Sequence, residues 1–378
     1  NLNQFKFIHI AGTSGKGTVT AMVHQILHQA GYKIGSFYSP HPTTSIERIY
    51  AGANYISPSD FVKMLDKIKP SIEDVYLNSK YGLPSYFEIL FALALLYFQQ
   101  KKCEYVVLEA GCGGEFDATN IIKKPLITAI TNIGFDHTQL LGNTLQKIAK
   151  TKAGIIKPGS IFLTTEKRKA ILKIFQSVCY KTNAKFIPLI SSKNTLTSNT
   201  MLATQICEKL HIKQEAISMD LKNFSLSCRF EIAQKNPTVI LDGAHNFDKI
   251  KSTVDNLQNL EFKKLFLIFT LNENKDVKRI INYIAGEQKF VPLQTNIYIT
   301  RHLVSSRTCA DLKLMYNLFL DANKKLKPKI FLDPWQALKQ AIKKAGKHDL
   351  ILITGSFYLA GELRKKWISE EKILKNNQ

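Results

Sequence analysis

The chain has 378 residues, of which 45% are hydrophobic and 22% charged, and its formal net charge is +22. This length predicts two domains, each large enough to bury its own core, and the composition excludes a disordered or fibrous protein. The longest apolar run, residues 89–98, is too short to cross a bilayer, which excludes a membrane-spanning helix.

The charge and the cysteines bear on partners and compartment. The positive charge raises nucleic-acid binding as a hypothesis. Because the lysines are scattered and no recognition module accompanies them, anionic small-molecule substrates explain the charge as well, and we expect no nucleic-acid partner. The six cysteines form no C-x-x-C pair, which favours reduced thiols. No signal segment precedes the first predicted strand, so we expect a soluble, cytoplasmic protein, and a monomer.

The first predicted element is an apolar strand at residues 5–11, which runs through a glycine turn into a helix. The turn reads Gly12-Thr-Ser-Gly-Lys-Gly-Thr18, and the helix repeats apolar residues with helical spacing. Such a turn is an anion cradle, because backbone N–H groups close around a phosphate while Lys16 and the helix start add positive charge. Thr18 supplies a hydroxyl for Mg²⁺. Gly17 departs from the usual phosphate loop, so a structural turn is the alternative, but the flanking elements favour nucleotide phosphate binding.

Further strands and helices alternate after this turn. An apolar helix is predicted at residues 86–100, and buried strands at 105–109 and 126–130. Strands that are apolar on both faces and alternate with helices predict a parallel sheet that is covered on both sides.

Polar side chains follow several of these strands. Four of them lie just past predicted strand ends: Lys16, Ser39, Glu109 and His137. Because ligands gather at the carboxyl ends of parallel strands, we expect these residues to converge on one crevice. A carboxylate at such a place is costly unless it is paired or bound to a metal. Oxygen and imidazole donors suit Mg²⁺ between a nucleotide and a substrate, although a solvated carboxylate and an ordinary loop histidine are the alternatives.

The second half of the chain begins with a polar stretch. Residues 190–200 read as a loop, followed by a helix over residues 201–210. After Asn236-Pro237 a new alternation of helices and strands begins, with strands expected at residues 239–242, 265–270, 297–300, 330–332 and 350–354. We therefore predict an α/β protein with a P-loop ATPase-like parallel-sheet domain over residues 1–235 and a smaller, Rossmann-like α/β domain over residues 236–378.

Motifs from residue 7 to residue 363 occur in the order of one known family. They are Gly12-Thr-Ser-Gly-Lys-Gly-Thr18, Ser39-Pro-His41, Glu47-Arg48-Ile49, Phe87-Glu88, Glu109 with Gly111 to Asn120, Asp136-His137, Lys152-Ala-Gly-Ile-Ile-Lys-Pro-Gly159, Asp242-Gly-Ala-His-Asn246 and Gly355-Ser-Phe-Tyr-Leu359. With them the chain resembles the folylpolyglutamate synthase/dihydrofolate synthase family of the Mur ligase superfamily.

The resemblance implies an ATP-dependent amide ligase of folate biosynthesis. Such an enzyme joins L-glutamate to dihydropteroate, to a (tetrahydro)folyl-polyglutamate, or to both, through an acyl phosphate, and uses ATP and Mg²⁺. A Mur-type peptidoglycan amino-acid ligase shares the mechanism and is the first alternative, although the Asp-Ala-Thr-Asn and Ser-Phe-Tyr-Leu motifs favour the folate branch. The alternative from another class is a nucleotide-dependent nucleic-acid-binding protein.

The resemblance also implies roles for individual residues. The ATP-binding positions are Gly12, Thr13, Ser14, Gly15, Lys16, Gly17, Thr18, Asn199, Arg229, Asp242 and His245. The metal ligands are Thr18, Ser39, Glu109 and His137, and the catalytic residues are Lys16, Glu109, His137 and Lys152. ATP is then clamped between the two domains. Without the resemblance, Arg229 reads as an ordinary surface arginine.

Two further segments match the family. The positions that contact the pterin end of the substrate are Ser85, Tyr86, Phe87, Glu88, Phe116 and Asp117, although aromatic residues near a helix start are more often core. Lys152 opens the segment whose first lysine is carbamylated; CO₂ adds only to a neutral amine, which requires a desolvated lysine, and a solvated surface lysine is the alternative. The chain departs from the family at Glu115, where arginine is common.

Overall fold

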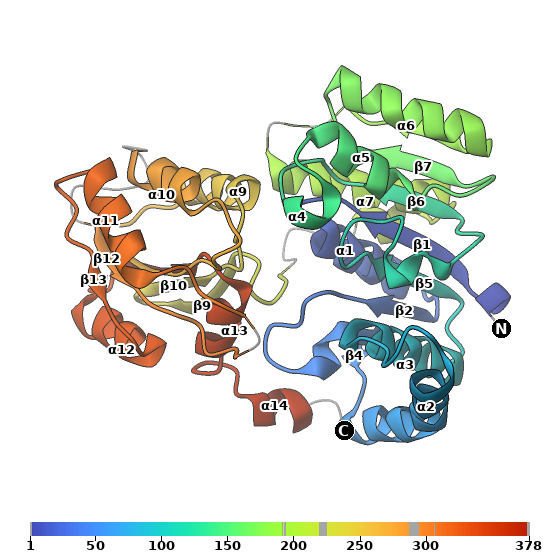
Figure 1. Cartoon of the computed structure of the whole chain (residues 1–378), viewed down its shortest axis with the longest axis horizontal. Helices are drawn as coiled ribbons and strands as arrows, with labels where there is room; N and C mark the ends of the chain where they lie inside the picture. The colour runs from blue at the N-terminus through green and yellow to red at the C-terminus, as the bar shows by residue number, and fades with distance from the viewer. Residues whose placement is uncertain are drawn as a thin grey trace. The chain divides into compact units, whose positions relative to one another are not determined.

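The computed structural model describes residues 2–190, 192, 194–218, 225–286, 295–305 and 307–375. It divides into two compact units, one formed by residues up to 224 with the segment that starts at Ile373, the other by residues 225–372 (Figure 1). Each unit is an α/β fold around its own sheet, which confirms the predicted fold class. The division falls upstream of the boundary expected near residue 235, because β9 (Glu231–Lys235) pairs with β10 (Thr238–Leu241) in the second sheet.

The first unit contains an eight-stranded sheet of order β4-β3-β2-β5-β1-β6-β7-β8. Its strands are β1 (Lys6–Ala11), β2 (Ile34–Phe37), β3 (Ile49–Ala51), β4 (Asn54–Tyr55), β5 (Tyr105–Glu109), β6 (Ile127–Ile130), β7 (Ile161–Thr164) and β8 (Lys185–Pro188). The six neighbouring strands β2, β5, β1, β6, β7 and β8 pair in parallel, as expected. At one edge, β3 and β4 add antiparallel pairs that the sequence did not predict.

Helices cover both faces of this sheet (Figure 1). They are α1 (Lys16–Gln29), α2 (Pro58–Asn78), α3 (Tyr86–Gln100), α4 (Thr138–Leu141), α5 (Leu145–Ala153), α6 (Lys169–Thr182), α7 (Thr195–Lys209) and α8 (Gln214–Ser218), with the 3-10 turns η1 (Leu2–Gln4), η2 (Ser45–Arg48) and η3 (Ala118–Ile121). Alternate residues of β1 point to opposite faces, so Ile8 and Ile10 pack with α1 and α7, while Ala11 packs with α5 and α6.

The helix predicted to begin at residue 201 begins at Thr195 instead. Asn194 caps it by accepting a hydrogen bond from Thr197 N at 3.1 Å, and the first turns carry Ser and Thr, which hide the helical pattern. The expected loop over residues 190–200 is therefore wrong from Thr195 onward, and Asn199 lies buried on α7. Residues 191 and 193 of that stretch lie outside the described part of the chain.

The second unit contains a six-stranded sheet of order β13-β12-β11-β14-β10-β9, parallel except for β9. Its other strands are β11 (Leu265–Phe269), β12 (Asn296–Ile299), β13 (Lys329–Ile330) and β14 (Leu350–Thr354). Its helices are α9 (Phe247–Leu257), α10 (Val277–Gly286), α11 (Leu312–Ala322), α12 (Pro334–Lys344) and α13 (Phe357–Arg364), and α14 (Glu370–Lys375) ends the described chain. One face packs against α9, α10 and α11 and the other against α12 and α13, as in a Rossmann-like fold.

Neither unit contains, within its described residues, a helix with the length and apolar character needed to cross a membrane. All six cysteines are free thiols, as the sequence predicted.

We expect Gly35→Ala to destabilise the first unit by about 1–3 kcal/mol, the usual cost of overpacking a core. A Cβ at Gly35 in β2 would lie 2.4 Å from Cδ1 of Phe98, whose ring is fully buried. Urea unfolding followed by circular dichroism measures the change. Gly286→Ala is the matched control, because a Cβ there meets no atom of the described residues within 4 Å. Equal midpoints for the two variants would contradict the prediction.

Candidate active site

The first glycine turn is held so tightly that only glycine fits at two positions. Gly12 has φ of +143°, and a Cβ there would lie 1.9 Å from Thr131 Oγ1. Gly15 is left-handed, with φ of +85°, and a Cβ there would lie 2.4 Å from Asn199 Oδ1. The side chain of Asn199, predicted to contact ATP, therefore lies against the turn.

The segment after β6 braces this turn. Ser14 N donates to Asn132 Oδ1 at 2.9 Å, and Gly134 N donates to Thr13 Oγ1 at 2.8 Å. Thr131 Oγ1 in turn donates to Ser14 O at 2.5 Å. Thr131 and Asn132 were not among the predicted site residues, although polar residues directly after a buried strand are a signal that could have indicated them. These bonds fix the backbone whose N–H groups would meet a phosphate.

Two lysines share one carbonyl oxygen of the turn. Lys16 Nζ donates to Gly12 O at 3.2 Å, and Lys152 Nζ of α5 donates to the same oxygen at 2.9 Å. Lys152 is only 4% exposed, so the alternative of a solvated surface lysine is wrong. Burial, followed by the charge of Lys16, lowers the pKa of Lys152 to about 7. Lys16 therefore brings positive charge to this edge of the sheet, beside a lysine whose ammonium form burial disfavours.

Glu109, at the end of β5, is buried beside the start of α1. It is 2% exposed, so the alternative of a solvated carboxylate is wrong. Its Oε2 accepts a hydrogen bond from Ser39 N at 3.0 Å, and a Cβ at Gly17 would lie 3.0 Å from the same oxygen. The glycine that departs from the usual phosphate loop is therefore what lets α1 approach this carboxylate. Thr18 follows it, half-buried, in the first turn of the helix.

His137 is arranged differently from Glu109. It is left-handed, with φ of +50°, its side chain is 40% exposed, and Nε2 lies 3.9 Å from Asp136 Oδ1. Among the described residues, no three His, Cys, Asp or Glu side chains gather closely enough to hold a metal ion. A magnesium ion here would therefore depend on hydroxyl and phosphate oxygens as well as on carboxylate, which is how Mg²⁺ is commonly bound beside nucleotides.

The donors fit ATP. Ser14 Oγ is buried and has no hydrogen-bond partner within the described chain, so a phosphate oxygen could accept its proton. Backbone N–H groups of the turn, the N-terminus of α1 and Lys16 surround the same place. The residues present therefore match the charge and hydrogen-bonding needs of a nucleoside triphosphate.

The segment predicted to contact the pterin end surrounds a second glycine turn, residues 111–114. Phe116 is 87% exposed, whereas the ring of Phe87 is packed so close that a Cβ at Gly111 would lie 2.9 Å from it. Asp117 Oδ2 accepts from Cys112 N at 2.8 Å and so closes the turn. Among the aromatic residues predicted to contact the pterin, Phe116 has the most exposed ring, ahead of Tyr86 at 52%.

Glu115, where the family commonly has arginine, is anchored through its backbone. Its N–H donates to Thr151 O at 2.8 Å, and a Cβ at Gly154 would lie 2.5 Å from the Cβ of Glu115. Its carboxylate raises the pKa of Lys157, against the larger lowering by burial. The negative charge of Glu115 is therefore partly balanced by Lys157, which lies shortly after the end of α5.

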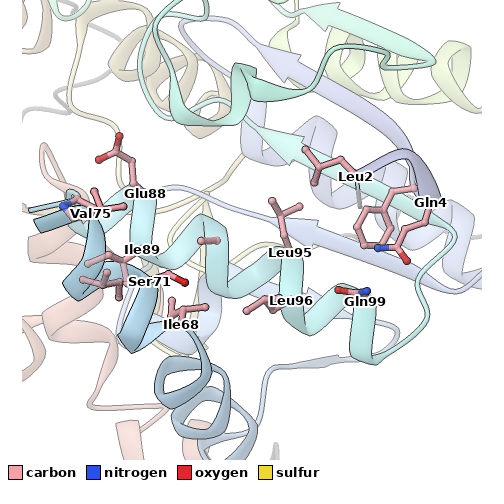
Figure 2. A pocket seen from close by; sticks show the side chains of 14 residues that line it. Leu2, Gln4, Ile68, Ser71, Val75, Glu88, Ile89, Leu95, Leu96 and Gln99 are labelled. Atoms are coloured by element: carbon pink, nitrogen blue, oxygen red, sulfur yellow. The ribbon is translucent and has the colours of Figure 1, made fainter. Parts of the chain in front are cut away.

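Ser85 and Glu88 form the capping box of α3. Glu88 N donates to Ser85 Oγ at 3.3 Å, and Ser85 N donates to Glu88 Oε2 at 2.7 Å. Tyr86, between them, is within 2.6 Å of Ser45 Oγ through its hydroxyl. Glu88 also lines a groove of about 510 Å³ between α2 and α3, whose walls are mainly aliphatic, as Ile68 illustrates (Figure 2). Ser85 and Glu88, which were predicted to contact the substrate, therefore stabilise the start of α3.

Asp242 of the second unit organises the backbone after β10. Its Oδ2 accepts from Phe230 N at 2.8 Å, while Oδ1 accepts from Ala244 N and from Thr253 Oγ1, each at 2.9 Å. Burial raises the pKa of Asp242, and the hydrogen bonds and Arg229 oppose that rise.

His245 and Arg229 lie around the same turn. His245 Nδ1 donates to Gly243 O at 2.7 Å, which leaves Nε2 to accept from Lys249 Nζ at 3.1 Å. The guanidinium of Arg229 lies 5.0 Å from the ring centre of Phe357, in the Gly-Ser-Phe-Tyr-Leu motif. The predicted ATP-contacting residues of this unit therefore gather at the carboxyl edge of its sheet.

Comparison with known proteins gives the family. The chain is 30% identical to the dihydrofolate synthase/folylpolyglutamate synthase of Bacillus subtilis, over 96% of this chain and 90% of the relative. The chain belongs to this family. The model of the Mur ligase middle domain matches residues 10–230, and that of the Mur ligase glutamate ligase domain matches residues 228–357.

Solved structures show the same fold. The Escherichia coli relative in complex with DHPP and ADP has a TM-score of 0.82 and 23% identity, and covers 95% of this chain and 88% of that one. A bifunctional folylpolyglutamate synthase/dihydrofolate synthase with Mn, AMPPNP and L-glutamate bound has a TM-score of 0.78 and 24% identity, over 96% and 89%. As a folylpolyglutamate synthase/dihydrofolate synthase family member, the protein is an ATP-dependent ligase of folate metabolism.

Proposed function

We propose that this ligase joins L-glutamate both to dihydropteroate and to folyl-polyglutamates. The relative from Bacillus subtilis is named for both activities and matches over nearly the whole chain. The observation that carries the site assignment is the convergence of Lys16 and Lys152 on the Gly12 carbonyl, beside a glycine turn at a helix start. The charge of Lys16 and the N–H groups of the turn suit a triphosphate and a carboxylate that must come together despite their like charges, while Lys152 lies close enough to act on the same groups.

The reaction has two steps. The acceptor carboxylate attacks the γ-phosphorus, so that an acyl C–O–P linkage forms, the bond to the β-phosphate oxygen breaks and ADP leaves. The amine of L-glutamate then attacks the acyl carbon, the amide C–N bond forms, inorganic phosphate leaves and the amine loses a proton. Little covalent chemistry falls to the protein, whose role is to position the groups and neutralise charge.

Lys16 and the N–H groups of the turn hold the β- and γ-phosphates in this proposal, with Asn199 beside them. Thr18, Ser39, Glu109 and His137 hold the divalent cation, which offsets phosphate charge when bound. Arg229, Asp242 and His245 of the second unit contribute further to ATP binding.

Lys152 is carbamylated in this proposal. Its neutral amine attacks CO₂, an N–C bond forms and one proton is released, which leaves an anion where an ammonium stood. The low pKa that burial gives Lys152 supports this, because the neutral form is substantially populated near neutral pH. The carbamate then serves the cation site as a glutamate would.

Phe116 stacks on the pterin ring in the proposed complex, since its ring is the open one of the 111–117 segment. Ser85, Tyr86, Phe87, Glu88 and Asp117 shape the wall behind it. We also propose that the enzyme is a cytoplasmic monomer. Size-exclusion chromatography tests its oligomeric state.

One assay tests the function. The protein is incubated with ATP, Mg²⁺ and L-glutamate, and separately with dihydropteroate, tetrahydrofolate, a peptidoglycan nucleotide precursor or RNA, while ADP release and product mass are followed. We expect ADP release coupled to a product heavier by one glutamyl residue with the first two acceptors only. Ligation to the peptidoglycan precursor, or ATP turnover that needs RNA, would replace the folate assignment.

Glu109→Gln and His137→Ala are expected to lower turnover and raise the Mg²⁺ concentration that half-maximal rate requires. Each removes a proposed donor to the cation. Loss of a residue that only hydrogen-bonds to a metal ligand already weakens a site by roughly 10- to 100-fold, so loss of a ligand is expected to cost at least as much. Initial rates across a magnesium titration measure both effects. Glu104→Gln is the control, because that carboxylate pairs with Lys6 at the surface. A variant that keeps the parent's rate and magnesium dependence has lost no metal ligand.

A further inference from the structure

A buried histidine stands in the central strand of the first unit. His9 lies in β1 and is 0% exposed, on the face opposite Ile8 and Ile10. Its Nε2 lies 2.8 Å from Oγ1 of Thr119 in η3, and its Nδ1 is buried with no hydrogen-bond partner among the described residues. An aliphatic side chain would avoid the cost of that unpaired nitrogen. The contact that an aliphatic residue could not make is the one to Thr119.

The direction of this hydrogen bond follows from the next one. Thr119 Oγ1 lies 2.5 Å from Asp117 Oδ1, and an ionised carboxylate only accepts, so the hydroxyl proton points at Asp117. The same hydroxyl must then accept from His9, whose proton is on Nε2. Burial lowers the pKa of His9 to about 3, which keeps the ring neutral, so only one of its two nitrogens carries a proton. A directed chain of hydrogen bonds therefore runs from β1 to Asp117.

Asp117 uses that orientation to close the second glycine turn. Its Oδ1 also accepts from Thr119 N at 3.1 Å, and its Oδ2 accepts from Cys112 N at 2.8 Å. One carboxylate thus ties the two ends of the segment that carries the exposed ring of Phe116. If the hydroxyl of Thr119 turned away, the first of these oxygens would lose its shortest contact.

We propose that His9 is a positioning residue for the folate-type acceptor: through Thr119 it fixes Asp117, and so holds residues 111–117 in the conformation that receives the pterin ring. The inference rests on the proposed function, because it assigns the acceptor to this segment. His9 itself touches no substrate in it.

Two substitutions of His9 test the proposal, with a second buried histidine as control. His9→Leu keeps the bulk and removes the donor, whereas His9→Gln keeps an N–H that can reach Thr119. His24 is 3% exposed and contacts Ser36 Oγ and Gly52 O, so His24→Leu reports the general cost of removing a buried imidazole.

The readouts are kcat, the KM values for dihydropteroate and ATP, and hydrogen–deuterium exchange over residues 111–120 without substrates. For His9→Leu we expect the KM for dihydropteroate to rise roughly tenfold, the KM for ATP to stay within twofold, and exchange at the Cys112 and Thr119 amides to quicken. His9→Gln is expected to recover most of both changes, and His24→Leu to show neither.

Several results would overturn the proposal. They are parent-like KM and exchange in His9→Leu, equal rises in both KM values, or the same pattern in His24→Leu. If His9→Leu does not fold, Thr119→Val removes the other end of the same hydrogen bond and is held to the same outcomes. If the parent itself ligates neither dihydropteroate nor tetrahydrofolate, the proposed function fails, and exchange over residues 111–120 alone decides whether His9 orders the segment.

Discussion

Replacing Lys16 with alanine is expected to lower kcat by about 10³-fold or more and to leave the fold intact, which is the scale of losing a cation that meets transferring phosphate. The side chain is half-buried, and its Nζ donates to the Gly12 carbonyl rather than packing in the core. Removing it therefore leaves the phosphate charge uncompensated without opening a cavity. Single-turnover ADP formation and circular dichroism of the variant measure the two halves of this expectation.

The matched control is Lys33→Ala, which makes the same change of charge at an exposed position of the same unit. It is expected to keep the parent's rate, which excludes a general effect of net charge. A folded Lys16→Ala enzyme with near-normal turnover would remove the glycine turn from the phosphoryl-transfer step.

Where local chemistry dictates structure, the sequence predicted it closely. The helix over residues 86–100 and the strand over 105–109 have the expected bounds, because Ser85 and Glu88 cap the helix start and the strand is apolar on both faces. The edge strands β3 and β4 were missed, since short strands at a sheet edge owe their form to pairing with β2 rather than to their own pattern.

The same contrast holds for the candidate site: features set by the local sequence were predicted, whereas contacts between distant segments were not. A glycine turn between a strand and a helix predicted the phosphate cradle from sequence order alone. No local pattern reveals that Lys152 reaches the Gly12 carbonyl 140 residues away, or that a Cβ at Gly17 would crowd the carboxylate of Glu109. Those contacts depend on which strands are neighbours. They exist because β5 and β6 flank β1 in the sheet.

The pterin-side residues show the limit of matching motifs. Phe87 and Asp117 lie at the second glycine turn, but the ring of Phe87 contacts Phe37 and the oxygens of Asp117 are used by backbone and hydroxyl donors. A motif identifies the segment that is proposed to line the pterin site. The burial and partners of each side chain indicate which member, here Phe116, can meet a ligand directly.

We expect Lys152→Ala to abolish ligation, and added acetate or formate to restore part of the ligation rate. The proposed carbamate supplies an anion beside the cationic Lys16, so its loss removes support for the divalent cation. A small carboxylate can enter the space that the side chain leaves and replace that anion. Initial ligation rates, with and without millimolar carboxylate, measure both effects.

The chemistry of carbamate formation adds a signature that a merely structural lysine lacks. The neutral fraction of an amine with a pKa of about 7 rises from about one tenth to about nine tenths between one pH unit below and one above that value. Ligation should therefore increase as pH rises through this range, and fall in CO₂-free buffer until bicarbonate is restored. Lys150→Ala, an exposed lysine on the same helix, should match the parent in every condition. Full activity of the Lys152→Ala enzyme, or a rate indifferent to bicarbonate, would show that the ammonium form is the working one.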